Sequence, residues 1–480
     1  MKATKLISGT GRHQRNPVRS SRSACARKFN WQRPVTLVCA FGILSMSNST
    51  GVRAVESLPD SGAVKVQILQ TNGRYQLYVD HQPFYIKGAG IEFGSQEKLK
   101  EHGGNSFRTW STWNGRDSGQ EILERARRNG LYVTMGLDLG HERHGFDYND
   151  TNAVARQFES VKAQVVQYKD SPALIIWAIG NELNMDGQNP KVWDAVNDIS
   201  RMIHQIDPNH PTTTPLAGFK REVVQEVQSR APDLDFLSFQ MYGDIVNLPR
   251  YLRESGWAGP YMVTEWGATG HWEVGRTEWG APIEDDSTTK ADFYRKRFEI
   301  AIQADPRDCL GSYVFLWGNK QERTPTWYGM FLDSGEETAS VDTMQYLWTG
   351  SWPAVRSPEI EGAWLNGKTA RQNVHLKPGE AYAASVEASD CNHNALTYRW
   401  DVMEECTDLK AGGDIESKPR SLPGLVRTAE GGKIVLKAPS RPGAYRLFAY
   451  IFDGKGHAAH VNIPFYVDPP AVTSAETANQ

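Results

Sequence analysis

Short apolar runs alternate with amphipathic stretches through the middle of this chain. The predicted strands are residues 84–93, 105–109, 131–139, 174–179, 212–216, 236–242, 261–265 and 310–317. Helical periodicity or helix-start signals between them predict helices that include residues 96–101, 152–168, 192–206, 222–229, 289–304 and 341–348, and a capping box at Ser118 and Glu121 begins another. Eight strand–helix units over about 290 residues predict an α/β fold of the (β/α)8 barrel type. A doubly wound open sheet is the alternative, but no glycine-rich phosphate loop follows any strand.

The pattern changes on both sides of this barrel, which together with an N-terminal hairpin we assign to residues 55–355. Residues 64–78 form two short alternating runs around Asn72-Gly73, a hairpin expected to close the bottom of the barrel. From residue 358 to 467 only short alternating runs remain, and 445–452 with 460–467 predict a second hairpin. About 110 residues of this kind predict an immunoglobulin-like β-sandwich over 356–468, followed by a disordered tail at 469–480. The sandwich resembles accessory modules of secreted polysaccharide enzymes, and either glycan binding or spacing would suit it.

The first 54 residues have the composition of a signal peptide. Residues 2–33 are rich in Arg and Lys without an acidic residue, residues 35–46 are apolar, and a small residue, Ala54, offers a cleavage site. A single-pass anchor is the alternative, but the apolar run is shorter than the ~20 residues of a membrane span. We therefore expect a secreted or periplasmic protein without stable membrane insertion after processing.

Composition and charge narrow the range of partners. The chain of 480 residues is 39% hydrophobic and 23% charged, with a net charge of −3, so nothing favours nucleic acid or an anionic membrane. Fifteen Trp residues are a stronger signal, because several follow predicted strands directly. There they would offer flat stacking surfaces to a ligand with apolar faces, although core packing is the alternative.

Cysteine and histidine positions favour no metal or cofactor site. Export leaves Cys309, Cys391 and Cys406, of which Cys391 and Cys406 flank a predicted hairpin and could pair in an oxidising compartment. Cys309 precedes an apolar strand and is expected to be a buried thiol. The run His141-Glu-Arg-His144 lies in a predicted loop, whereas a helical zinc site needs two histidines on one helix face.

Polar residues gather where the predicted strands end. Asn181 and Glu182 follow the apolar run 174–179, and Glu265 ends the similar run in Tyr-Met-Val-Thr-Glu-Trp-Gly at 261–267. In a (β/α)8 barrel the carboxyl ends of the strands form the active-site floor, so these carboxylates are placed for chemistry. A helix cap or a surface ion pair would be the alternative for Glu182. Further candidates at strand ends are Arg108, Trp110, His141, Tyr242 and Trp317.

Three motifs at these strand ends resemble a known clan of enzymes. They are Asn105-Ser-Phe-Arg108, Gly180-Asn181-Glu182 and Thr264-Glu265-Trp266-Gly267. The motifs occur in the order and at the strand ends expected for the retaining β-glycosidases built on (β/α)8 barrels. The chain in this respect resembles the catalytic domain of glycoside hydrolase family 2 in particular. Families 5 and 72 share the barrel and both glutamates, and stay open as alternatives.

The resemblance implies a role for each polar residue. Glu182 would be the acid/base and Glu265 the nucleophile, about 5 to 5.5 Å apart as a covalent intermediate requires. Arg108 and the Tyr242 hydroxyl would stabilise the ionised form of Glu265, whose charge then favours a protonated Glu182. Asn181 is expected to hold the sugar 2-hydroxyl.

Aromatic residues would supply the sugar platforms, because pyranose rings present C–H faces that stack on aromatic rings. The candidates are Trp110, Trp113, Trp266, Trp272, Trp317 and Trp327. Trp317 matches the floor tryptophan of the clan, whereas Trp113 and Trp272 are equally consistent with surface packing. His141 is a further expected contact to substrate.

The sequence therefore predicts an exported, metal-free retaining β-glycosidase of a β-linked glycan, with a β-glucan as the leading candidate. A transglycosidase would use the same residues, with a sugar in place of the attacking water. A carbohydrate-binding protein without catalysis is a rival from another class, and a metal-dependent barrel hydrolase would need ligands that the motifs do not supply.

Overall fold

The computed structural model describes residues 57–60, 62–428 and 431–470. The predicted signal peptide, and all but the first two residues of the predicted tail, lie outside the described residues. No helix among the described residues is long and apolar enough to cross a membrane.

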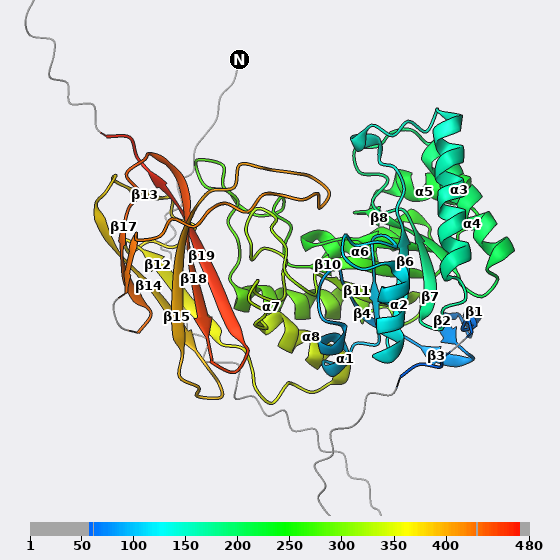
Figure 1. The fold of residues 1–480 in the computed structure, drawn as a ribbon, viewed down its shortest axis with the longest axis horizontal. Helices are drawn as coiled ribbons and strands as arrows, with labels where there is room; N and C mark the ends of the chain where they lie inside the picture. The colour runs from blue at the N-terminus through cyan, green and yellow to red at the C-terminus, as the bar shows by residue number, and fades with distance from the viewer. Residues whose placement is uncertain (1–56, 61, 429–430, 471–480) are drawn as a thin grey trace, which may run out of the picture. The chain divides into compact units, whose positions relative to one another are not determined.

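Eight parallel strands close into a barrel, in the order β10-β11-β4-β5-β6-β7-β8-β9 (Figure 1). They are β4 (Ile86–Gly90), β5 (Ser106–Arg108), β6 (Tyr132–Leu137), β7 (Leu174–Ile179), β8 (Thr212–Ala217), β9 (Phe236–Gln240), β10 (Tyr261–Gly267) and β11 (Cys309–Phe315). Every predicted strand is present, because each apolar run is buried on both faces as a parallel barrel requires. The predicted fold class is confirmed, and the open sheet is excluded by the closed ring.

Helices follow the strands and surround the barrel. They are α1 (Gln96–Glu101), α2 (Gly119–Arg128), α3 (Thr151–Tyr168), α4 (Lys191–Ile206), α5 (Arg221–Arg230), α6 (Leu248–Ser255), α7 (Ser287–Arg297) with the π-helix η4 (Phe298–Ile302), and α8 (Ala339–Thr349); the short 3₁₀ turns are η2 (Glu142–His144) and η3 (Gly243–Asn247). The predicted capping box begins α2, with Ser118 accepting from the Glu121 backbone nitrogen and the Glu121 side chain accepting in return. Helix α6 was not expected, because its eight residues span only about two turns.

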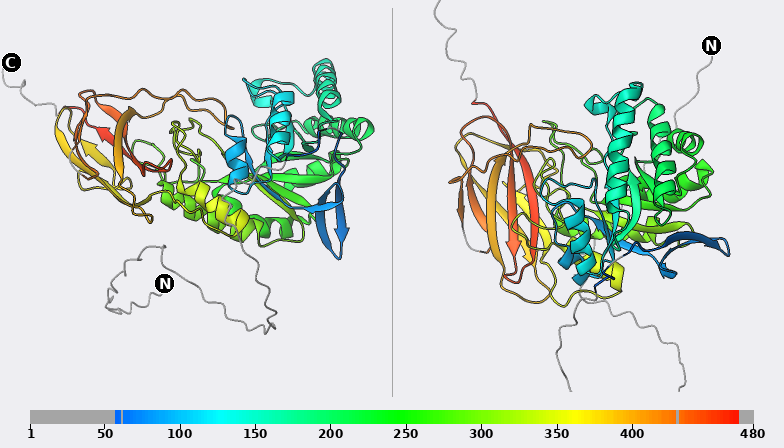
Figure 2. Two further views of the ribbon diagram at one scale, coloured as in Figure 1. Left: turned by 60° about the horizontal axis from the view of Figure 1, so that its bottom comes forward. Right: turned by 45° about the vertical axis from the view of Figure 1, so that its right-hand side comes forward.

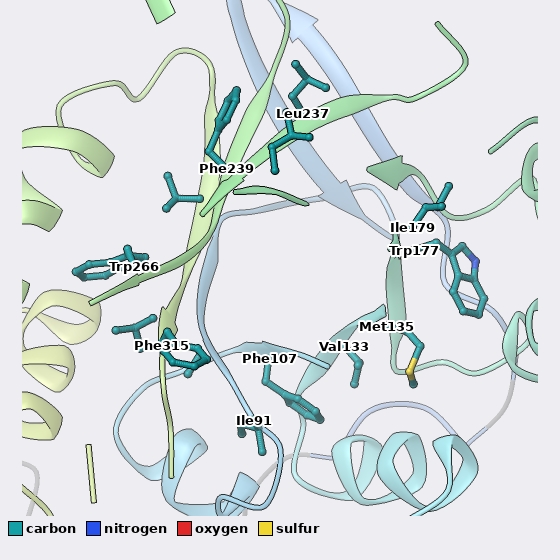
Figure 3. Close-up of a cluster of buried hydrophobic side chains, with 14 of the residues drawn as sticks. Ile91, Phe107, Val133, Met135, Trp177, Ile179, Leu237, Phe239, Trp266 and Phe315 are labelled. Carbon is teal, nitrogen blue, oxygen red and sulfur yellow. The ribbon is translucent and has the colours of Figure 1, made fainter. Parts of the chain in front are cut away.

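The main core lies between the ring of strands and the helices. Figure 3 shows part of this core around the ring, with Trp177 and Trp266 directed outward. All six residues of β7 are buried, and the Trp177 indole donates to Asp207 Oδ2 at 2.7 Å. Burial of the whole strand fixes where β7 ends and so where Asn181 and Glu182 begin.

A small sheet covers the amino-terminal ends of the barrel strands. It contains β1 (Val66–Thr71), β2 (Arg74–Val79) and β3 (Gln82–Phe84), with Asn72 and Gly73 at φ 54° and 72° in the first turn (Figure 2). Its apolar face joins the lower ends of the barrel strands in one buried cluster, for example Val79 with Met262. The prediction that this hairpin closes the bottom of the barrel is confirmed.

The C-terminal region folds as two four-stranded sheets. One has the order β12-β14-β17-β16 and the other β13-β19-β18-β15. The strands are β12 (Glu359–Leu365), β13 (Val374–Leu376), β14 (Ala381–Ser389), β15 (Thr397–Glu404), β16 (Val426–Thr428), β17 (Lys433–Lys437), β18 (Gly443–Phe452) and β19 (Ala458–Val467). The two inner faces share a buried core that includes Leu436, Leu447 and Phe465. The second predicted hairpin is β18–β19.

The suggested pairing of Cys391 and Cys406 is wrong. The two residues flank the single strand β15 rather than a hairpin, and its eight residues span roughly 26 Å, far beyond the reach of a disulfide. The Cys406 thiol is buried and contacts Glu416 Oε2 at 3.8 Å. Cys309 is a buried thiol, as expected.

Buried polar contacts join the sandwich to the barrel. The Glu284 carboxylate, with a side chain 0% exposed, accepts from Lys290 Nζ at 2.5 Å and from Asn462 Nδ2 of β19 at 2.6 Å. The Arg446 guanidinium of β18 donates to the Pro282 carbonyl at 2.9 Å. Because these groups are buried at the contact, the sandwich is fixed against the barrel rather than tethered to it.

Candidate active site

A cavity of about 1030 Å³ opens at the carboxyl ends of the barrel strands. Residues that end or follow all eight strands line it, and Glu182 and Glu265 are both among them. The cavity therefore lies where the barrel predicts an active site.

The Glu265 carboxylate, at the end of β10, accepts hydrogen bonds on both oxygens. Oε1 accepts from Arg108 Nη1 at 3.1 Å, Trp110 Nε1 at 2.8 Å and Gln240 Nε2 at 3.0 Å. Oε2 accepts from the Tyr242 hydroxyl at 2.8 Å. Burial, followed by the Glu265 charge, raises the pKa of Tyr242 well above its usual value, so this hydroxyl keeps its hydrogen. The four donors hold the carboxylate in one orientation.

Asn181 belongs to the same network. Its Oδ1 accepts from Arg108 Nη2 at 2.9 Å and from Gln240 Nε2 at 2.7 Å. Two donors on this atom fix the orientation of the amide, and its nitrogen has no partner among the described residues. Asn181 therefore presents a donor in the cavity beside Glu265.

Glu182 has different surroundings. Its backbone has a positive φ of 51°, held by the hydrogen bond from its nitrogen to the Pro215 carbonyl at 2.9 Å. A positive φ is uncommon for glutamate and occurs where surrounding structure enforces it, often at functional sites. Within the described part of the chain, no side chain hydrogen-bonds its carboxyl group. Burial, followed by the nearby charge of Glu265, raises the pKa of Glu182 well above that of an ordinary glutamate.

The loop after β6 brings His141 and Arg143 to the cavity. Arg143 Nη1 donates to His141 Nδ1 at 3.1 Å. Burial, together with the charges of Arg143 and His144, lowers the pKa of His141 to about 4. His141 is therefore neutral near pH 7, with its hydrogen on Nε2.

Aromatic side chains line the cavity in two groups. Trp110 and Phe315 form part of its wall, their ring centroids 5.8 Å apart and nearly perpendicular. Trp113 and Trp272 also line it, and each is 56% exposed. Exposed indoles at a cavity are the aromatic faces most open to a sugar ring.

Three predicted sugar platforms are wrong. Trp266 is 0% exposed and packs outward against Tyr294 and Phe298, away from the cavity. Trp317 is also 0% exposed, and its indole donates to the Ser95 carbonyl at 3.0 Å. Trp327 is 1% exposed and donates to the Thr269 carbonyl at 2.9 Å. All three are core residues.

The residues of the site that were not found from the sequence include Gln240 and Phe315. Gln240 joins Asn181 to Glu265 through one amide nitrogen, but a single glutamine at a strand end carries no motif. Phe315 takes the place at the end of β11 that we assigned to Trp317, because β11 ends two residues earlier than expected. Among the described residues no cluster of three His, Cys, Asp or Glu side chains could hold a metal ion.

Comparison with known proteins gives short but consistent likenesses. No protein-family model matches the chain. Over 97 residues, 17% of this chain, it is 32% identical to mannan endo-1,4-β-mannosidase F of Aspergillus clavatus. Over 91 residues, 16% of this chain, it is 31% identical to a probable mannan endo-1,4-β-mannosidase C of Aspergillus terreus. The matched segments cover 22% of each relative.

Solved structures with a similar fold include two glycoside hydrolases. β-Glucuronidase 2 of Bacteroides uniformis is 12% identical, with 84% of this chain and 48% of that chain covered and a TM-score of 0.46. A glycoside hydrolase family 5 mannosidase of Rhizomucor miehei is 14% identical, with 59% of this chain and 96% of that chain covered and a TM-score of 0.41. At these identities the likeness concerns the fold alone.

The chain resembles the (β/α)8 glycoside hydrolases. This likeness agrees with the one expected from the three strand-end motifs.

Proposed function

We propose that this protein is a glycoside hydrolase that cleaves a β-linked glycan with retention of anomeric configuration, with Glu265 as nucleophile and Glu182 as acid/base. The observation that carries the proposal is the contrast between two buried carboxyl groups at one cavity. Glu265 accepts four hydrogen bonds, whereas the Glu182 carboxyl accepts none from a side chain of the described residues. Two carboxyl groups whose environments differ in this way are suited to opposite roles.

In the first step Glu265 attacks the anomeric carbon while Glu182 gives its proton to the glycosidic oxygen, and the bond between that carbon and oxygen breaks. Oε2 is the better attacking atom, because Oε1 already accepts three hydrogen bonds and Oε2 accepts one. In the second step Glu182 takes a proton from water, whose oxygen attacks the anomeric carbon and releases Glu265. The free amide nitrogen of Asn181 is available to a sugar hydroxyl beside the nucleophile.

The substrate we propose is a polymer rather than a single sugar. The exposed faces of Trp113 and Trp272 offer stacking surfaces in the same cavity as the two carboxyl groups, as successive sugar units of a chain would need. β-1,4-Mannan is the first polymer to test, because mannan endo-1,4-β-mannosidases are similar over part of the chain. β-Glucan, the candidate from the sequence motifs, is the second. Export, proposed from residues 1–54, would bring the enzyme to such polymers.

The test is to incubate the wild-type protein and Glu265→Gln with β-1,4-mannan, β-glucans and galactans. Product size is resolved by chromatography and the anomeric configuration of the first product by NMR. We expect β-configured products from the wild type and a loss of at least about 10⁴-fold in Glu265→Gln, since the covalent step is removed. Glu159→Gln, an exposed glutamate on α3, is the matched control.

Each alternative has a distinct outcome in this assay. Inverted products would reject the two-step mechanism, and full activity in Glu265→Gln would reject the nucleophile. Products longer than the substrate would show that a sugar replaces water in the second step. Binding of polymer without cleavage by the wild type would make the chain a carbohydrate-binding protein.

A further inference from the structure

A loop of the C-terminal sandwich, residues 405–420, extends to the mouth of the barrel. This cleft loop is part of the connection between β15 and β16 and is the orange segment that projects from the sandwich toward the barrel in Figures 1 and 2. Gly412, Gly413 and Asp414 at its tip line the same cavity as Glu182 and Glu265. The wall of the candidate active site therefore includes residues from outside the barrel.

The base of the cleft loop is bound to residues that follow β11. The Arg323 guanidinium pairs with the Glu416 carboxylate, whose side chain is 0% exposed, and the Arg323 backbone nitrogen donates to Glu416 Oε2 at 2.5 Å. A further Arg323 nitrogen donates to the Lys410 carbonyl at 2.9 Å. Nearer the tip, Lys320 Nζ donates to the Gly413 carbonyl at 2.5 Å. A buried ion pair with additional hydrogen bonds fixes this part of the loop.

The tip contacts the other side of the mouth. His144 Nε2 lies 2.9 Å from Asp414 Oδ2, and Arg143 Nη2 lies 3.5 Å from Asp414 Oδ1 and 3.4 Å from the Gly412 carbonyl. The approach at Gly412 is close, because an added Cβ would lie 2.8 Å from Arg143 Cζ and 2.9 Å from Met185 Sδ, and one of these side chains would have to move. In the ring of eight strands, β6 lies three places and β7 four places from β11, so the cleft loop crosses the mouth.

The tip contacts the barrel beside Glu182. Met185 lies on the turn that follows Glu182 and donates its backbone nitrogen to the Glu182 carbonyl at 2.8 Å. Arg143, which contacts Asp414, is also near enough for its charge to lower the pKa of Glu182. An acid/base protonates the oxygen of the departing sugar, so the space next to it takes the leaving group and, later, the acceptor.

We propose that the cleft loop forms the subsite for the leaving-group sugar, with Asp414 accepting hydrogen bonds from its hydroxyl groups. The proposal rests on the proposed glycosidase function. The Asp414 side chain is 38% exposed, so it keeps room for a ligand while it holds His144 and Arg143. The C-terminal sandwich is then part of the substrate site rather than a separate binding module.

Two substrates that share the reacting sugar and differ in the leaving group test the subsite. One is a 4-nitrophenyl β-glycoside and the other is a β-linked oligosaccharide, both built from mannose in a first comparison and from glucose in a second. In Asp414→Ala we expect KM for the oligosaccharide to rise about tenfold or more, because a hydrogen bond to a charged group is lost. We expect kcat/KM for the nitrophenyl glycoside to change less than about threefold, since that leaving group offers Asp414 no hydroxyl.

Asp414→Asn and Glu361→Ala complete the comparison. Asp414→Asn keeps the size and one acceptor oxygen and should fall between the wild type and Asp414→Ala. Glu361 is exposed on β12, and its substitution should leave KM and kcat/KM unchanged for both substrates. Equal effects of Asp414→Ala on both substrates, or no effect on either, would overturn the subsite.

Calorimetric titration of the oligosaccharide into Glu265→Gln separates this proposal from the proposed function. If the wild type cleaves the oligosaccharide and Asp414→Ala has the same kinetics, the subsite is excluded and the proposed glycosidase function is not affected. If the wild type does not cleave the oligosaccharide, its binding to the two variants decides. Affinity about tenfold weaker for Glu265→Gln/Asp414→Ala than for Glu265→Gln would support the subsite, and equal affinity would exclude it. Neither cleavage nor binding would overturn both proposals.

Discussion

Glu182 and Glu265 differ in what surrounds them rather than in burial. Glu182 is 8% exposed and Glu265 is 5% exposed. Four side-chain donors nevertheless contact the Glu265 carboxylate, whereas no side chain of the described residues donates to the Glu182 carboxyl group. An isolated buried carboxyl near a negative charge favours its protonated form. The proposed first step needs that proton, so this environment sets the pH range in which Glu182 can act.

The charge of Arg143 should lower the pH at which activity is lost on the alkaline side. The pKa of Glu182 is raised by burial and by Glu265, and Arg143 acts against that rise. The acid form is present below this pKa and is lost as pH rises through it, so kcat/KM should fall on the alkaline side above the usual glutamate range. In Arg143→Ala the pKa rises further and this limb should move to higher pH. Measured profiles of kcat/KM against pH check the shift.

Arg253→Ala, an exposed cation on α6, is the control and should leave the limb in place. Arg143→Ala also loses its contact with Asp414, so its maximal rate can fall. The pH at which kcat/KM falls is nevertheless independent of the maximal rate. A limb that stays in place or moves to lower pH would contradict the assignment of Glu182 as the acid.

Gln240 should contribute to activity through Glu265. Its Nε2 lies 3.0 Å from Glu265 Oε1 and 2.7 Å from Asn181 Oδ1, so one donor orients both groups. Gln240→Met keeps the approximate shape but removes the donor, and kcat/KM should fall about 10- to 100-fold. Steady-state kinetics measures the loss, and thermal unfolding checks that the variant is folded. A variant with wild-type kinetics would show that Arg108 and Tyr242 suffice to orient the nucleophile.

Sequence patterns placed the polar residues of the site better than its aromatic residues. Arg108, Asn181, Tyr242 and Glu265 form one hydrogen-bond network because motifs at strand ends fix both residue type and position. Trp266 follows Glu265 within β10, and successive strand residues face opposite sides. A glutamate that faces the cavity therefore puts the next residue in the core. Gln240 was missed because its partners come from β7 and β10, which no local pattern joins.

At the scale of elements, β5 and β6 approach each other closely at Gly136. An added Cβ would lie 2.4 Å from the Trp110 carbonyl carbon and 2.6 Å from the Thr109 oxygen, both of them backbone atoms. Trp110 donates from its indole to Glu265, so the position of its backbone matters to the site. The close packing of these two strand ends thus links the fold directly to the orientation of the proposed nucleophile.

Gly136→Ala should lower both stability and activity. Backbone atoms cannot turn aside as a side chain can, so the strand end must shift, at a cost of about 1–3 kcal/mol in the free energy of unfolding. The displaced Trp110 should reduce kcat about tenfold or more. Chemical denaturation and steady-state kinetics measure the two effects. Gly275→Ala is the matched control, since nothing lies within 4 Å of its added Cβ; equal behaviour of both variants would contradict the argument.

Element positions were predictable where burial dictates an apolar run, as in Leu174–Ile179, whose bounds agree with β7. Helix α6 was missed because eight residues give too few turns for a clear period. The cleft loop was beyond sequence reasoning for another reason. Arg323 and Glu416 are 93 residues apart, and neither lies in a periodic segment that would predict their contact.

At the scale of the whole molecule, a buried charge network holds the sandwich on the barrel. Glu284 accepts from Lys290, Thr324 and Thr326 of the barrel and from Asn462 of the sandwich. Burial alone would raise the pKa of Glu284, but the charges of Lys290 and His460 and the hydrogen bonds from Lys290 and Thr324 lower it to about 2. Since the cleft loop belongs to the sandwich, this network also keeps Asp414 at the active site.

The Glu284 network should make the protein sensitive to acid. Its pKa is depressed from 4.5 to about 2 in the folded state, so its contribution is complete above pH 4.5 and is lost as pH falls through about 2. That shift corresponds to about 3 kcal/mol of the free energy of unfolding. Glu284→Gln should unfold at a lower temperature at pH 7, and its melting temperature should depend less on pH between 4.5 and 2 than that of the wild type. Thermal unfolding by circular dichroism across this range checks both, with the exposed Glu361→Gln as control.

Some acid sensitivity should persist in Glu284→Gln because of His460. Burial and the Lys290 charge lower the pKa of His460 to about 3, so below pH 6.5 the unfolded chain binds a proton that the folded protein does not, and the folded state loses stability. Parallel curves for the wild type and Glu284→Gln would show that the charge of Glu284 does not hold the two domains together.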